Sequence, residues 1–188
     1  MNVPNTLTFL RIALSPVFFL SFFADSWFNL PARATAPVIL VLFLVIELSD
    51  LFDGMAARKL KQETDLGKVL DPFADSFSRL TYFLCFAFKG IMPVWIFFIV
   101  LYRDLGVAFV RLLAAGKGKV LSARLSGKIK AVVYAVAGMA GVLYVVFLRL
   151  DFEMPFKTEL ILAPLFYLTG GVALWSLADY VLSLRERK

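Results

Sequence analysis

The sequence predicts an all-α integral membrane protein with six transmembrane helices and both termini in the cytoplasm. Of its 188 residues, 61% are hydrophobic, and the mean hydropathy of +0.82 exceeds what a soluble globular domain needs. Six apolar stretches are long enough to cross a bilayer. Lysine and arginine gather in alternate connections between these stretches, as the positive-inside rule requires of cytoplasmic segments. The length suits a single membrane domain over residues 1–188.

The individual spans follow from the apolar runs. The first has no charged segment before it and no convincing cleavage site, so we expect a retained anchor and not a signal peptide. It contains Arg11, which we expect to snorkel to the membrane interface; the alternative is that it faces the active site. We expect a loop over residues 24–37, a helix start or a kink at Pro72, and close helix packing at Gly138 and Gly141. The predicted spans are residues 7–23, 38–53, 70–88, 94–115, 131–148 and 160–182.

Charge and rare residue types narrow the classes of function. The formal net charge is +6, and its clustering in particular loops indicates membrane topology and anionic lipid or phosphate, and not nucleic acid. The chain has no histidine, which excludes imidazole bases and histidine metal sites. Its one cysteine, Cys85, lies in an apolar run and cannot form an internal disulfide.

Four aspartates stand out in this apolar sequence. Read as helices, Asp50 and Asp53 fall on one face, and Asp71 and Asp75 fall on one face of the next helix. A polar connection between the helices would let the four carboxylates meet. Clustered carboxylates repel one another unless cations neutralise them, and oxygen ligands favour a hard ion, Mg²⁺ or Mn²⁺. A solvated acidic cap is the alternative, but aspartates are costly at membrane depth.

The pattern D-x2-D-G-x2-A-R-x8-G-x3-D-x3-D, from Asp50 to Asp75, resembles the signature of the CDP-alcohol phosphatidyltransferases at every defined position. This resemblance implies metal-dependent transfer of a phosphoryl-linked group from a CDP-alcohol to a second alcohol, with release of CMP. It implies two ions held by the four aspartates, with Asp71 and Asp75 catalytic and Asp75 the base. A short N-terminal run, with Thr8 and Arg11, is also similar to the family. The implied nucleotide-binding residues are Asp50, Gly54, Ala57, Arg58 and Gly67.

Downstream residues resemble the bacterial phosphatidylglycerophosphate synthases within that family. Arg103 and Asp104 are adjacent and are not expected to share a helix face, whereas Arg103 and Arg111 lie eight residues apart on one stripe. The resemblance implies CDP-diacylglycerol as donor and glycerol 3-phosphate as acceptor. One position departs from it, because those synthases usually carry lysine where this chain has Ser76. The implied contacts to the acceptor phosphate are Arg103, Arg111, Lys128 and Lys130.

Two other interpretations stay open at this point. One keeps the family and changes the acceptor to inositol phosphate, serine or a choline-type head group. The other is a cation carrier that uses the aspartates as an ion path, although carrier sites form near the bilayer midplane and these carboxylates lie at one interface. The expected location is the bacterial inner membrane, with the active site facing the cytoplasm and membrane lipid around it. The sequence leaves a homodimer open.

Overall fold

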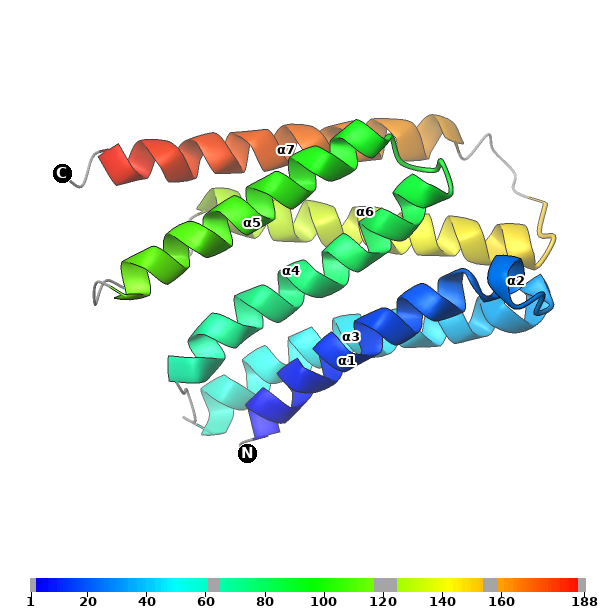
Figure 1. Ribbon diagram of the computed structural model, residues 1–188, viewed down its shortest axis with the longest axis horizontal. Helices are drawn as coiled ribbons and strands as arrows, with labels where there is room; N and C mark the ends of the chain where they lie inside the picture. Colours follow the sequence, from blue (N-terminus) through cyan, green and yellow to red (C-terminus); the bar gives the residue numbers. More distant parts are fainter. Residues whose placement is uncertain (1–2, 61–64, 117–124, 154–158, 186–188) are drawn as a thin grey trace. The chain divides into compact units, whose positions relative to one another are not determined.

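The computed structural model describes residues 3–60, 65–116, 125–153 and 159–185 of the chain (Figure 1). These residues form helices and no strand, which confirms the predicted all-α class. Six long helices overlap the six predicted spans, and one short helix lies between the first two. The helices are α1 (Val3–Phe22), α2 (Ala24–Trp27), α3 (Ala32–Leu60), α4 (Asp65–Phe88), α5 (Val94–Gly116), α6 (Leu125–Arg149) and α7 (Glu159–Arg185).

Three of the described helices contain stretches that are long and apolar enough to cross a membrane. These stretches are Ala32–Ser49, Leu125–Arg149 and Leu160–Leu182, and α1 contains a shorter apolar stretch, Thr8–Phe22. Aspartates and arginines inside α4 and α5 interrupt the apolar runs of these two helices. The structure therefore supports a helical membrane protein, and the number of spans and the side on which the termini lie stay predictions.

One local expectation is wrong, and of the two alternatives at Pro72, a helix start or a kink, the structure excludes the start and the kink stays a prediction. Residues 24–37 do not form a continuous loop, because Ala24–Trp27 is helical and α3 already begins at Ala32. The ring of Trp27 packs edge-on against that of Phe19 with centroids 5.6 Å apart, which helps to hold the short helix against the end of α1. Pro72 does not start a helix, because α4 begins at Asp65 and runs through it. Proline removes one backbone donor, a loss that membrane helices tolerate.

The helices pack into two compact units, which are described separately. The first unit comprises Met1–Cys85 and Val142–Phe156, and the second comprises Phe86–Gly141 and Lys157–Lys188. In the first unit α1 packs along α3. Phe18 of α1 and Phe43 of α3 converge on Tyr82 of α4, with ring centroids 4.9 and 5.0 Å from that of the tyrosine. These three rings are buried and form the centre of an aromatic core.

Arg149, the last residue of α6, closes one end of the first unit. Its Nη2 donates to the backbone carbonyl of Phe22 at 2.6 Å and to the carboxylate of Asp25 at 2.9 Å, and its Nη1 donates to the hydroxyl of Thr35. Because Phe22 ends α1, the guanidinium lies at the carboxyl end of that helix, where a positive charge is stabilising.

The second unit is built on α5 packed along α7. Its core includes the rings of Phe86 and Phe166, whose centroids are 5.9 Å apart. Gly141 of α6 permits a close approach, because a Cβ at this position would lie 2.5 Å from Cε2 of Phe86. The close packing predicted at Gly141 is thereby confirmed.

We expect Gly141→Ala to lower the midpoint of thermal unfolding in detergent, and Gly171→Ala to leave it unchanged or raise it. Alanine favours a helix over glycine by about 1 kcal/mol at either position. At Gly141, however, the methyl group would overlap the Phe86 ring, and overpacking costs roughly 1–3 kcal/mol. A Cβ at Gly171 meets no atom within 4 Å, so this variant is the matched control. An unchanged midpoint for Gly141→Ala would show that the ring moves aside freely.

Candidate active site

The two halves of the aspartate signature lie on consecutive helices, as predicted. The first half belongs to α3, which continues to Leu60, and the second half belongs to α4. The side chains of residues 50–69 are outside those that the structure describes, so several predicted site residues have a helix assignment only. These residues are Asp50, Asp53, Gly54, Ala57, Arg58 and Gly67.

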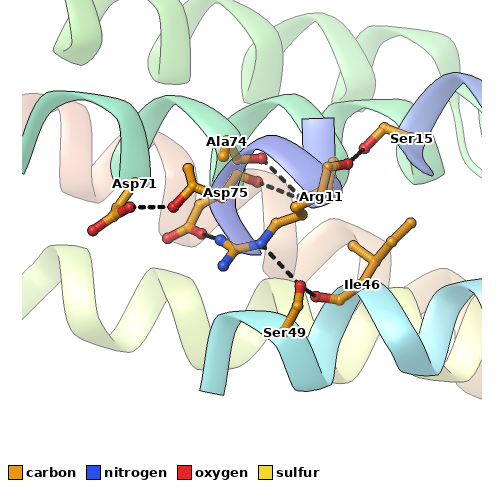
Figure 2. Close-up of polar contacts among 9 residues, drawn as sticks. Arg11, Ser15, Ile46, Ser49, Asp71, Ala74 and Asp75 are labelled. Carbon is orange, nitrogen blue, oxygen red and sulfur yellow. Dashed lines mark hydrogen bonds and ion pairs between the residues drawn. The ribbon is translucent and has the colours of Figure 1, made fainter. Parts of the chain in front are cut away.

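The two described aspartates are held by side chains of α1. Thr8 donates its hydroxyl to Oδ1 of Asp71 at 2.7 Å, and Arg11 forms an ion pair with Oδ1 of Asp75. Thr8 and Arg11 lie one turn apart on α1, as Asp71 and Asp75 do on α4, so the two contacts are in register. Figure 2 shows Arg11 between Asp75 of α4 and Ser49 of α3.

Arg11 does not snorkel, which corrects the first expectation for this residue. It is only 1% exposed, and its Nε donates to the hydroxyl of Ser49 at 3.4 Å. That hydroxyl in turn donates to the carbonyl of Ile46 at 2.7 Å. A guanidinium taken out of water needs an opposite charge and further acceptors, and Asp75 and Ser49 supply both inside the unit. Arg11 therefore faces Asp75 of the candidate site, and the alternative that this is the active site stays a prediction.

The described carboxylates suit a hard cation in their chemistry. Asp71 and Asp75 present oxygen ligands from successive turns of α4, which is the donor type that Mg²⁺ and Mn²⁺ prefer. The side chain of Asp75 is 30% accessible, so it is open to a bound group. Within the described ranges no set of three or more candidate ligands forms a metal site. The two aspartates thus fit one half of the predicted ligand set, and the other half lies outside the described side chains.

A second polar cluster lies in the second unit, among α5, α6 and α7. Oδ1 of Asp104 accepts from Nη1 of Arg103 at 2.9 Å and from Nζ of Lys130 at 2.8 Å. Nη2 of Arg103 also donates to the hydroxyl of Ser176 at 2.6 Å. All four residues are buried. Two cations and one carboxylate leave a surplus of one positive charge in this cluster.

Arg103 and Asp104 are in contact although adjacent residues do not share a helix face. The arginine side chain is long enough to turn back toward its neighbour, and a carboxylate stabilises its charge in the interior. Of the four predicted acceptor-binding residues, Arg103 and Lys130 are joined through Asp104. Arg111 instead donates from Nε to the hydroxyl of Tyr180 at 2.9 Å, and Lys128 is exposed.

Several partners in these clusters were missed by sequence reasoning. Thr8 was noted only as part of a run similar to the family, although its spacing from Arg11 places both on one helix face. On α7, Ser176, Asp179 and Tyr180 also share a face; each bonds to a polar residue of α5 or α6, and Ser126 donates to Asp179. Polar residues at helical spacing on an otherwise apolar helix are the signal that could have identified this face.

Known proteins with similar sequences agree on one family. A family model described as CDP-alcohol phosphatidyltransferase matches residues 1–177. A CDP-diacylglycerol–glycerol-3-phosphate 3-phosphatidyltransferase of Treponema pallidum is 37% identical over 155 residues, which are 79% of this chain and 70% of that protein. A Bacillus subtilis protein of the same name is 33% identical over 159 residues, 81% of this chain and 80% of that protein. One from Aquifex aeolicus is 42% identical over 109 residues, 56% of this chain and 55% of that protein.

We expect Asp104→Asn to lower the free energy of unfolding by about 3–5 kcal/mol, because it leaves Arg103 and Lys130 buried without a carboxylate. Asp151→Asn is the matched control. Asp151 pairs with Arg33 at 2.8 Å, but both side chains are more than 70% exposed, and such pairs contribute less than about 1 kcal/mol. Unfolding in mixed micelles measures both changes. A loss at Asp104 as small as that at Asp151 would show that the cluster does not depend on this carboxylate.

Proposed function

Because the chain belongs to the CDP-alcohol phosphatidyltransferase family, we propose that it transfers a phosphatidyl group from CDP-diacylglycerol to glycerol 3-phosphate in phospholipid biosynthesis, with release of CMP. Relatives in Treponema pallidum and Bacillus subtilis carry the name of this activity. The observation that carries the proposal is the pair Asp71 and Asp75, one turn apart on α4 and held by α1.

The four aspartates of the signature would hold two divalent ions, Mg²⁺ or Mn²⁺. Bound there, the ions would neutralise the diphosphate of the donor and help CMP to leave. The oxygen chemistry of Asp71 and Asp75 supports this assignment, as does the matching spacing of Asp50 and Asp53 on α3. Gly54, Ala57, Arg58 and Gly67 would bind the nucleotide together with Asp50, because small residues let a ligand approach the helix backbone.

Asp75 would take the proton from the attacking hydroxyl of the acceptor. A base must be reached by the substrate, and the Asp75 side chain is 30% accessible although its partner Arg11 is buried. The ion pair with Arg11 keeps one carboxylate oxygen in place. Asp71, one turn earlier, would complete the ligand set beside it.

Four cations of the second unit would bind the acceptor. Arg103, Arg111, Lys128 and Lys130 are the candidate contacts to its phosphate, and the positive surplus around Asp104 supports a negatively charged ligand. This surplus favours glycerol 3-phosphate or inositol phosphate over serine or a choline-type head group, which carry no phosphate. A cation carrier would not need a surplus of positive charge around Asp104, because that surplus would repel its cargo.

We also propose six membrane spans in one domain over residues 1–188, with both termini and the active site on the cytoplasmic side of the bacterial inner membrane. The alternation of basic and acidic connections supports this orientation. The assembly of the chain as a homodimer stays a prediction.

We expect Asp71→Asn and Asp75→Asn each to reduce CMP release from CDP-diacylglycerol by at least about 100-fold. Each change removes a charged ligand or the base while keeping the size of the side chain, so membrane insertion and yield should be retained. The assay is CMP release with glycerol 3-phosphate and Mg²⁺ or Mn²⁺, with the lipid product identified by mass. Asp151→Asn, at an exposed aspartate, serves as the control. Turnover near the wild-type rate in either variant would exclude that residue from the chemistry.

We expect Arg111→Ala to raise the KM for glycerol 3-phosphate roughly 10- to 100-fold, with little change in the KM for CDP-diacylglycerol. The expectation assumes the loss of one charge-assisted contact to phosphate, about 1.5–3 kcal/mol. Arg33→Ala is the matched control, because Arg33 is an exposed arginine of the first unit. An unchanged acceptor dependence, or a wild-type preference for an uncharged alcohol, would contradict the glycerol 3-phosphate assignment and leave the transferase class intact.

A further inference from the structure

α1 bonds to both described carboxylates of the signature. The contacts come from Thr8 and Arg11, whose side chains are buried, and not from residues of the signature itself. The main helix neighbour of α1 is α3, and the contacts of Thr8 and Arg11 reach past it to α4.

We propose that Thr8 and Arg11 are positioning residues that hold the Asp71 and Asp75 carboxylates in the orientation that binds divalent cations. The inference rests on the proposed function, in which these aspartates are metal ligands. A carboxylate that binds a metal is commonly oriented by a hydrogen bond to one of its oxygens, and loss of such a bond typically weakens metal binding 10- to 100-fold.

The Thr8 contact restricts Asp71 without adding charge. At 2.7 Å, the hydroxyl of a fully buried side chain fixes one carboxylate oxygen, Oδ1. A threonine hydroxyl in a helix can be satisfied by a carbonyl of its own helix. That this one reaches across to α4 is the feature that points to a role in orienting Asp71.

The Arg11 contact fixes Asp75 through a chain of bonds. The carbonyl of Ile46 accepts from Ser49, the hydroxyl of Ser49 accepts from Nε of Arg11, and Arg11 pairs with Oδ1 of Asp75 (Figure 2). This chain connects α3, α1 and α4. The planar guanidinium can face Ser49 and Asp75 at once, which a lysine ammonium on a flexible stem does less well.

Thr8 gives the cleaner test of the two residues. A cation beside a metal ligand also repels the metal, so a change at Arg11 alters orientation and charge together. Removing Arg11 would in addition leave Asp75 without its partner, which threatens folding. Threonine and valine are nearly equal in shape, so Thr8→Val removes the hydroxyl and keeps the packing.

The experiment measures the affinity of the purified full-length protein for Mn²⁺ alone, by calorimetry in detergent. We expect Thr8→Val to weaken the Kd for Mn²⁺ 10- to 100-fold, and Thr8→Ser, which keeps a hydroxyl, to stay close to the wild type. Thr169→Val is the matched control: Thr169 is equally buried, and its hydroxyl donates to the carbonyl of Leu165 in its own helix. Arg11→Lys should also weaken Mn²⁺ binding, because lysine lacks the Nε–H that Ser49 accepts.

Wild-type affinity in Thr8→Val would overturn the proposal, and so would equal losses in Thr8→Ser and Thr8→Val, since the effect would then come from packing. No measurable Mn²⁺ binding by the wild type would overturn it as well. Wild-type affinity in Arg11→Lys would overturn the assignment of Arg11.

CMP release measured in parallel separates this inference from the proposed function. For Thr8→Val, turnover should recover as Mn²⁺ is raised, which a misfolded variant would not show. If the wild type binds Mn²⁺ in a Thr8-dependent way and releases no CMP, the proposed function fails and the inference stands. If the wild type releases CMP and Thr8→Val binds Mn²⁺ normally, the proposed function stands and the inference about Thr8 fails.

Discussion

The first unit depends on the burial of one guanidinium. Arg11 lies inside α1, a helix whose other residues are mostly apolar, and Asp75 and Ser49 meet it from α4 and α3 to offset the cost of its burial. A buried ion pair adds little net stability compared with well-packed hydrocarbon, but it penalises every arrangement in which its partners fail to meet. The pair therefore selects one register of α1 against α4, and that register places Thr8 opposite Asp71.

The two polar clusters have opposite charges. Asp71 and Asp75 outnumber Arg11 by one negative charge in the first cluster, and Arg103 and Lys130 outnumber Asp104 by one positive charge in the second. A cluster that contains uncompensated charge has a use for a ligand of the opposite sign. A surplus of carboxylate suits a cation, and a surplus of arginine and lysine suits a phosphate. The pair of Arg149 and Asp25 is balanced, which fits a purely structural role.

The long helices and the aspartate signature could be predicted from sequence because each depends on local pattern. Apolar runs locate helices, and spacing places Asp71 and Asp75 on one face of α4. The sequence pattern of one helix does not predict which residues of other helices its side chains contact. A single arginine in an apolar run usually reaches the interface, and only the position of Asp75, 64 residues away, draws Arg11 inward. The helix start, one of the two alternatives at Pro72, is excluded because the preference against interior proline is weaker in membrane helices.

The bonds of Arg149 have a consequence for how the chain is made. This arginine binds the carbonyl of Phe22, 127 residues earlier, so the N-terminal unit includes a piece of α6 that is synthesised long after the rest. At a translation rate of about 5–20 residues per second, roughly 6–25 s separate the two ends of this contact. By the end of that interval α1, α2 and α3 have been synthesised, but the Arg149 side chain that bonds to Phe22, Asp25 and Thr35 has not yet been available to them. The N-terminal unit therefore cannot finish folding in the order of synthesis, and its completion waits for the insertion of a later helix.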